Sequence, residues 1–223
     1  LNSSRSIILE AAIERELPAA LGEVANNLDA HLLLPITVSK TMSSNLYAQQ
    51  FISDGEQADD RPKVIANLKS IQNEFNTISA FLVSAKTGNY FTQSGLFKTL
   101  SKQNNKDQWF YDFMASGKKS ELSLDVDEET KIPTLFINYL MDVSGKPSAV
   151  VGVGLSLENM AKTISQYRIA QTGKVFLVDQ QGKIKLHPDT QQIGKSLTAL
   201  GVSNSQQLLS KAEFSSTEFI LNG

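Results

Sequence analysis

Cysteine is absent from the sequence, and histidine is almost absent. Without cysteine the chain has no disulfide bridge, no thiolate metal ligand and no cysteine nucleophile. The two histidines, His31 and His187, lie far apart along the chain, so they make a poor pair for a metal centre or a catalytic triad. The G-x-S-x-G and H-E-x-x-H patterns of hydrolases are also missing. We therefore expect no catalytic residue, no metal and no cofactor.

The chain also lacks an excess of one charge and any long apolar run. Its 21 basic and 23 acidic residues give a net charge of −2, without a basic stripe that would favour nucleic acid as a partner. No apolar run approaches the roughly 18 residues that span a bilayer, and Leu1 does not open a signal peptide. The pattern at residues 218–221 predicts a strand. A strand at a sheet edge needs a neighbouring strand or a cover, and here that segment would have to follow in the chain. We therefore expect a segment of a longer protein.

What the sequence does contain is enough apolar residues for a core. The 223 residues are 41% hydrophobic, which suits one large domain or two smaller ones. From residue 3 to about 53, apolar side chains recur at three- and four-residue steps, a pattern that predicts a helix of stalk-like length. Pro18 and Pro35 are expected to kink or break it, because proline removes a backbone donor and clashes with the preceding turn.

After residue 55 the pattern changes to short strands separated by turns. Apolar runs bounded by glycine and asparagine indicate antiparallel hairpins. The hairpin expected at 78–92 has the same plan as one at 173–187, which predicts two modules of one kind. The predicted elements are helices at 59–73, 107–116 and 157–167 and strands at 78–83, 90–92, 121–125, 134–141, 149–155, 173–179 and 184–187.

The fold class expected from these patterns is α+β, in three parts. A long N-terminal helical stalk occupies residues 1–55. An antiparallel-sheet module follows at 56–167, and the start of a second, incomplete module occupies 168–223. Antiparallel sheets suit the short connections between the predicted strands.

Four stretches of the chain carry a family likeness: the helix end at 35–51, the aromatic helix start at 107–113, the apolar strand at 151–157 and the strand–turn–strand stretch at 173–195. In order and spacing they resemble the double Cache (dCACHE) sensor domains of bacterial chemoreceptors, histidine kinases and diguanylate cyclases. The resemblance covers essentially the whole chain. It implies a stalk helix followed by two PAS-like modules, the first of which would bind a small molecule far from the membrane.

The resemblance also implies a setting. The chain would be the periplasmic, extracytoplasmic part of an inner-membrane receptor, anchored in the full-length protein and paired as a homodimer through its stalk. The stalk would pass the signal to a cytoplasmic kinase, cyclase or methyl-accepting domain. Because fold alone does not fix function, the site residues have to be considered one at a time.

In family members that bind amino acids, an arginine two positions before a tryptophan binds the ligand carboxylate. Here Asp107 stands in place of that arginine, the tryptophan is kept as Trp109, and Phe110 replaces a tyrosine. The family's ammonium-binding aspartate falls at Gly154. Both groups that clamp an α-amino acid are thus replaced, which argues against a standard amino-acid sensor.

An aromatic wall with acidic neighbours remains as the candidate site. Tyr111 extends the wall, a family tyrosine falls at Asp125, and the acid after it is kept as Asp127. Carboxylates form charge-assisted hydrogen bonds and aromatic faces attract ammonium groups, so the expected ligand is polar or cationic. On the strand expected at 134–141, either Asn138 or Tyr139 faces the pocket, because strand side chains alternate.

Each of these residues also has a purely structural interpretation. Asp125 and Asp127 suit a solvated turn, Asp107 suits a helix cap, and Trp109 suits core packing. A buried Asn138 is either a structural hydrogen-bond bridge or a ligand contact.

Three functions follow from the sequence. A small-molecule sensor is the main hypothesis. An interaction module that senses a protein, or spaces a dimer, is the alternative. An enzyme would need acid–base work from Asp125 and Asp127, which lie in an expected exposed turn.

Overall fold

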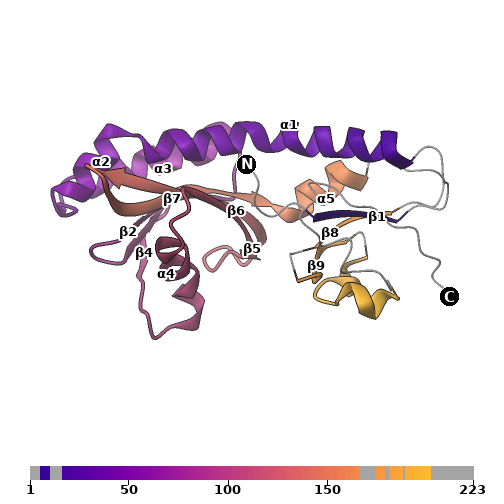
Figure 1. Ribbon diagram of the computed structural model, residues 1–223. Helices are drawn as coiled ribbons and strands as arrows, with labels where there is room; N and C mark the ends of the chain where they lie inside the picture. The colour runs from indigo at the N-terminus through magenta and orange to yellow at the C-terminus, as the bar shows by residue number, and fades with distance from the viewer. Residues whose placement is uncertain (1–5, 11–16, 166–173, 179–180, 188, 202–223) are drawn as a thin grey trace. The chain divides into compact units, whose positions relative to one another are not determined.

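The computed structural model describes residues 6–10, 17–165, 174–178, 181–187 and 189–201 of the chain. Two compact units are present: Leu32–Ser156 forms one, and Leu1–His31 together with Leu157–Gly223 forms the other (Figure 1). The predicted boundaries at residues 55 and 167 remain predictions.

The first unit is built on a six-stranded antiparallel sheet, which confirms the α+β class. Its strands run in the order β4-β3-β2-β7-β6-β5. The last strand of the unit along the chain, β7, therefore pairs with the first, β2. Every neighbouring pair is antiparallel. The strands are β2 (Ser79–Ser84), β3 (Asn89–Thr92), β4 (Gly95–Thr99), β5 (Ser120–Val126), β6 (Pro133–Val143) and β7 (Lys146–Ser156).

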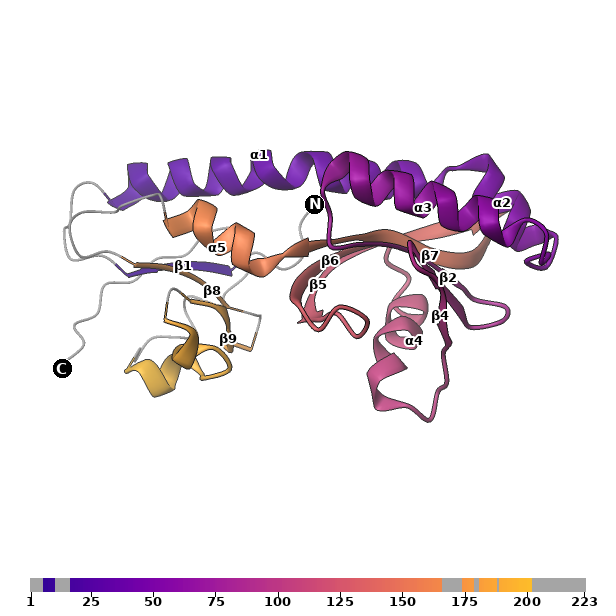
Figure 2. The same ribbon diagram turned by 180° about the vertical axis from the view of Figure 1, so that it is seen from behind.

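Helices cover one face of this sheet and form an aliphatic core with it. Helices α2 (Leu46–Ser53) and α3 (Arg61–Phe75) lie on this side, as Figures 1 and 2 show. The C-terminal part of α1 (Leu17–Ser43) adds Val38 and Met42 to the same core. The buried strand residues that they meet are Ala80, Leu82, Phe91, Ile137, Met141, Ala149, Val151 and Val153.

The prediction of a single helix from residue 3 to 53 is wrong at two places. Residues Ser6–Glu10 form strand β1, because a short run with two isoleucines fits a strand as well as a helix. The helix is also interrupted after Ser43, where the Asn45 side chain accepts a hydrogen bond from the Ala48 amide and caps α2.

Neither proline breaks α1. Pro18 is the second residue of the helix, where proline is tolerated because the first amides have no helical acceptor. Pro35 lies in the interior and the helix continues past it. Burial of Leu32 and Val38 on either side of Pro35 compensates the lost backbone hydrogen bond.

The other face of the sheet packs against α4 (Gln108–Ala115), which follows a 3₁₀ turn, η1 (Asn105–Asp107). Phe110 and Phe113 of this helix meet Phe81, Val83 and Val150 of the sheet in a second, aromatic cluster. Strand β4 on the sheet edge was not predicted.

The second unit contains a smaller antiparallel sheet in the order β1-β8-β9. Strands β8 (Lys174–Val178) and β9 (Ile184–Leu186) form the hairpin predicted at 173–187. The N-terminal part of α1, helix α5 (Leu157–Ser165) and the 3₁₀ helices η2 (Thr190–Gln192) and η3 (Leu197–Leu200) complete the described part of this unit. The strand predicted at 218–221 lies outside the described residues.

None of the helices within the described ranges combines the length and apolar character needed to cross a lipid bilayer.

Candidate ligand-binding site

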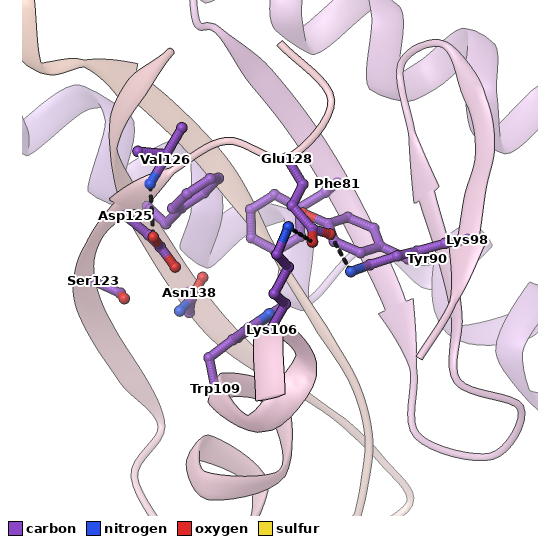
Figure 3. Close-up of a pocket in the computed structure, with 11 residues that line it drawn as sticks. Phe81, Tyr90, Lys98, Lys106, Trp109, Ser123, Asp125, Val126, Glu128 and Asn138 are labelled. Carbon is purple, nitrogen blue, oxygen red and sulfur yellow. Dashed lines mark hydrogen bonds and ion pairs between the residues drawn. The ribbon is translucent and has the colours of Figure 1, made fainter. Parts of the chain in front are cut away.

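A pocket lies on the α4 side of the six-stranded sheet (Figure 3). Its empty volume is about 470 Å³, which includes the open solvent at its mouth. Antiparallel register brings Phe136 and Asn138 of β6 beside Ser123 and Asp125 of β5 on one face. The lining residues are Phe81, Tyr90, Lys98, Lys106, Trp109, Ser123, Asp125, Val126, Glu128, Phe136 and Asn138.

Aromatic rings form the wall of the pocket. The Phe81 ring makes edge-to-face contacts with Tyr90, Trp109 and Phe136, at centroid distances of 5.8, 6.4 and 6.1 Å. Tyr90 also meets Trp109 at 6.3 Å. Such geometry stabilises each pair beyond simple burial. Burial, followed by the nearby carboxylate of Asp127, raises the pKa of the Tyr90 hydroxyl, so this group stays neutral.

A network of ion pairs closes one side of the pocket. Lys98 Nζ lies 2.5 Å from Asp107 Oδ1 and also donates to Glu128 Oε2. Lys106 Nζ lies 3.7 Å from the other Glu128 oxygen. Burial lowers the pKa of Lys98, but its hydrogen bonds to Asp107 and Glu128 outweigh that effect and raise it. Both lysine charges are therefore engaged by protein carboxylates (Figure 3).

Two acceptors in the pocket are not engaged in this way. The buried Oδ1 of Asn138 has no hydrogen-bond partner, although a buried polar atom normally has one. Asp125 is exposed and accepts one hydrogen bond, from the Val126 amide at 2.7 Å. Among the described residues, no cation pairs with the Asp125 carboxylate. An incoming donor group therefore finds both an amide oxygen and a carboxylate.

Three of the predicted site residues line this pocket: Trp109, Asp125 and Asn138. Tyr139 points to the opposite face and packs against the aliphatic core. Phe110 is buried in the aromatic cluster, and Tyr111 packs at its margin under Lys102.

Gly154 lies on the pocket face of β7 but does not line the pocket. A Cβ atom at this position would meet Ser79 Oγ at 2.6 Å and Thr134 Cγ2 at 2.7 Å. Close packing against neighbouring side chains thus accounts for the glycine.

Asp107 and Asp127 both act within the protein. The helix-cap interpretation of Asp107 is wrong: its side chain makes no capping bond to α4, and it accepts from Lys98 and from the Ser101 amide at 2.8 Å. Asp127 lies in a turn, where its Oδ1 accepts from the Glu129 and Thr130 amides at 3.1 and 2.7 Å, but the interpretation of that turn as solvated is wrong. Unlike a solvated turn residue, Asp127 is buried.

Sequence reasoning missed both lysines and Glu128. Lys98 was missed because strand β4 was missed, although Ser94-Gly95 is a turn signal between two apolar runs. Lys106 and Glu128 lie in connecting segments where no periodicity marks an inward residue. The described residues contain no group of three or more His, Cys, Asp or Glu side chains arranged to hold a metal ion.

No family model matches the chain. A curated relative is the methyl-accepting chemotaxis protein PctB of Pseudomonas aeruginosa, 37% identical over 81 residues. That match covers 35% of this chain and only 13% of the receptor.

Solved structures match over most of the chain. The ligand-binding domain of the Pseudomonas fluorescens chemoreceptor CtaA, in complex with L-isoleucine, has a TM-score of 0.61 and 22% identity, covering 81% of this chain and 71% of that one. The ligand-binding domain of the P. aeruginosa amino-acid chemoreceptor PctC, in complex with GABA, has a TM-score of 0.63 and 19% identity, covering 83% and 81%. These TM-scores establish a shared fold. The chain therefore has the fold of the double Cache ligand-binding domains of bacterial chemoreceptors, as its sequence resemblance predicted.

Proposed function

We propose that this chain is the extracytoplasmic small-molecule-sensing domain of a bacterial transmembrane receptor, and that it is not an enzyme. The ligand is a small polar or cationic molecule bound in the pocket beside Trp109. The observation that carries this proposal is the buried, unpartnered Oδ1 of Asn138 in an open aromatic pocket. A bound donor group would satisfy this oxygen, which otherwise reduces stability.

The predicted arrangement of the receptor forms part of this proposal. The module at 56–167 is membrane-distal, and the incomplete module at 168–223 is membrane-proximal and PAS-like. Helix α1 acts as the stalk that transmits the signal, in a homodimer anchored in the inner membrane. The output domain is a kinase, a cyclase or a methyl-accepting domain.

The named ligands of the similar domains set a useful contrast. CtaA is described with L-isoleucine and PctC with GABA, and both ligands carry a carboxylate. In this chain the lysines of the pocket are paired with Asp107 and Glu128. A free carboxylate on the ligand therefore has no free cation here among the described lining residues.

A thermal-shift screen tests the proposal. The domain is mixed with amines, amino acids, organic acids and sugars, and a ligand at 100 times its Kd should add about 2.7 kcal/mol to the free energy of unfolding. Asp125→Asn should reduce the shift, whereas Asp142→Asn, an exposed carboxylate outside the pocket lining, should not. Failure of every class of compound on folded protein would favour the alternative, a protein-sensing or dimer-spacing module.

A further inference from the structure

The carboxylate of Glu128 contacts both of the lysines that line the pocket. Lys98 binds one of its oxygens, and Lys106 Nζ lies 3.7 Å from the other. Figure 3 shows both lysines converging on this side chain from different elements, β4 and η1. Glu128 thus makes the ion pairs with the two lysines that the carboxylate of an anionic ligand could make in its absence.

The backbone holds Glu128 in this position. The preceding residue, Asp127, donates its amide to the Ile132 carbonyl at 2.9 Å and accepts from the Lys131 amide at 2.8 Å. Its side chain adds bonds to the amides of Glu129 and Thr130. This closed turn presents Glu128 to the lysines without further ordering, so an external carboxylate competes with a tethered, pre-organised one.

Two hydrogen-bond acceptors of the pocket are not engaged by its lysines. They are the buried Oδ1 of Asn138 and the carboxylate of Asp125. The hydroxyls of Ser123 and Tyr90 and the indole N–H of Trp109 are further polar groups of the lining, and these can donate. Trp109 lines the same pocket, and an indole ring can attract cations. Counting Asp107 with the lining residues, two lysines face three carboxylates, so the net charge of the site is −1.

We propose that Glu128 is an internal carboxylate that occupies the anion subsite and makes the pocket select amines without a carboxylate over the corresponding amino acids. This inference rests on the proposed function, because it names the ligand class of the same pocket. Glu128 acts as a specificity determinant: it repels a ligand carboxylate and retains the lysines. Asn138 and Asp125 then bind the ammonium group.

Matched ligand pairs test this selectivity by calorimetry. The pairs are phenethylamine with phenylalanine, 1,4-diaminobutane with ornithine, and 3-methylbutylamine with leucine; in each pair the α-carboxylate is the difference. The domain should bind at least one amine about tenfold or more tightly than its amino acid, a ratio that corresponds to about 1.4 kcal/mol.

Glu128→Gln should raise the affinity for that amino acid about tenfold, because Lys106 loses its carboxylate partner while Lys98 keeps Asp107. Glu128→Gln combined with Lys106→Met should lose the gain. Glu158→Gln, which breaks an exposed pair with Lys162 in the other unit, should leave the affinities unchanged. Glutamine retains an acceptor for Lys98, so Glu128→Gln is expected to fold.

The outcomes separate this inference from the proposed function. Amino acids that bind as tightly as their amines, or an unchanged preference in Glu128→Gln, would overturn the role of Glu128 and leave the sensor intact. Binding of sugars or organic acids alone would do the same. Absence of binding by every compound, in both the domain and the variant, would overturn both proposals.

Discussion

The two faces of the six-stranded sheet differ sharply in what they contact. The helix face is packed with aliphatic side chains such as Leu82, Ile137 and Val151, all about 1% exposed. The α4 face carries aromatic rings, an ion-pair network, an unpartnered amide oxygen and a pocket. Since strand side chains alternate, neighbouring residues of one strand serve these two purposes. Stability and recognition are thus separated by a single residue step along the strand.

The largest expected effect is on the helix face. Leu82→Ala removes a side chain that is 1% exposed and leaves a cavity, so we expect the free energy of unfolding to fall by about 2–5 kcal/mol. Ligand affinity of the folded fraction should not change, because Leu82 points away from the pocket. Urea denaturation and calorimetry measure the two quantities. A loss of affinity together with stability would break the separation of the faces.

The glycines of β7 test how tightly the pocket face is packed. A Cβ at residue 152 would lie 1.9 Å from the Ile137 carbonyl oxygen, which belongs to the backbone and is not easily moved. Gly152→Ala should therefore cost about 3 kcal/mol, near the top of the usual range for overpacking. Gly154→Ala meets side-chain atoms and should cost less. If chemical denaturation showed a larger loss of stability for Gly154→Ala than for Gly152→Ala, the backbone near residue 152 would move more easily than the close contact suggests.

The ion-pair network should contribute an intermediate amount. Lys98→Met leaves the carboxylate of Asp107, which is 1% exposed, without its cation, and we expect a loss of about 1–3 kcal/mol. Lys106→Met is the matched control: its side chain is 70% exposed and its pair is long, so its effect should stay below about 1 kcal/mol. If thermal unfolding showed the same loss of stability for both variants, burial would not distinguish the contributions of the two lysines.

The same network predicts a dependence on alkaline pH. Because the pKa of Lys98 is raised above its usual 10.5 in the folded state, its contribution is complete below that pH. It is lost as the pH rises through the higher value of the folded protein. The difference in stability between the protein and Lys98→Met should therefore shrink above about pH 10.5. A constant difference across this range would contradict the role given to the charge.

The smallest expected effect has the opposite sign. Asn138→Leu replaces a buried, unpartnered amide with an apolar side chain of similar size, which should raise the free energy of unfolding by about 1 kcal/mol. Ligand binding should be lost at the same time, since stability and function often oppose each other in a site. If the variant were both less stable and fully able to bind, Asn138 would be a structural bridge.

Much of the sheet could be predicted from sequence, because most of its strands are apolar or alternating runs between clear turn signals. The strands predicted at 121–125 and 134–141 correspond to β5 and β6. Strand β1 could not be predicted, since its pairing with β8 depends on residues more than 160 positions away. A periodic pattern alone does not reveal such a partner.

The candidate site was predicted less completely than the fold. Trp109, Asp125 and Asn138 line the pocket as the sequence suggested. Asp107, whose role was predicted wrongly, and Glu128, which was not predicted, illustrate why the rest could not be found. Whether a carboxylate meets a ligand or a lysine depends on which loop folds over it. That choice is made by tertiary contacts, on which the local sequence carries no information.

The pairing of β2 with β7 has a consequence for folding kinetics. Residues 79 and 154 become neighbours only when most of the first unit has closed into one loop, whereas the β5–β6–β7 meander pairs locally. Closing a long loop costs entropy before its contacts compensate, so we expect the meander to form early and the β2–β7 pairing late. The pocket then exists only in the fully folded state, and a ligand should slow unfolding without accelerating folding in stopped-flow experiments. Under the proposed function, the nascent domain could therefore bind no ligand until the whole sheet is complete.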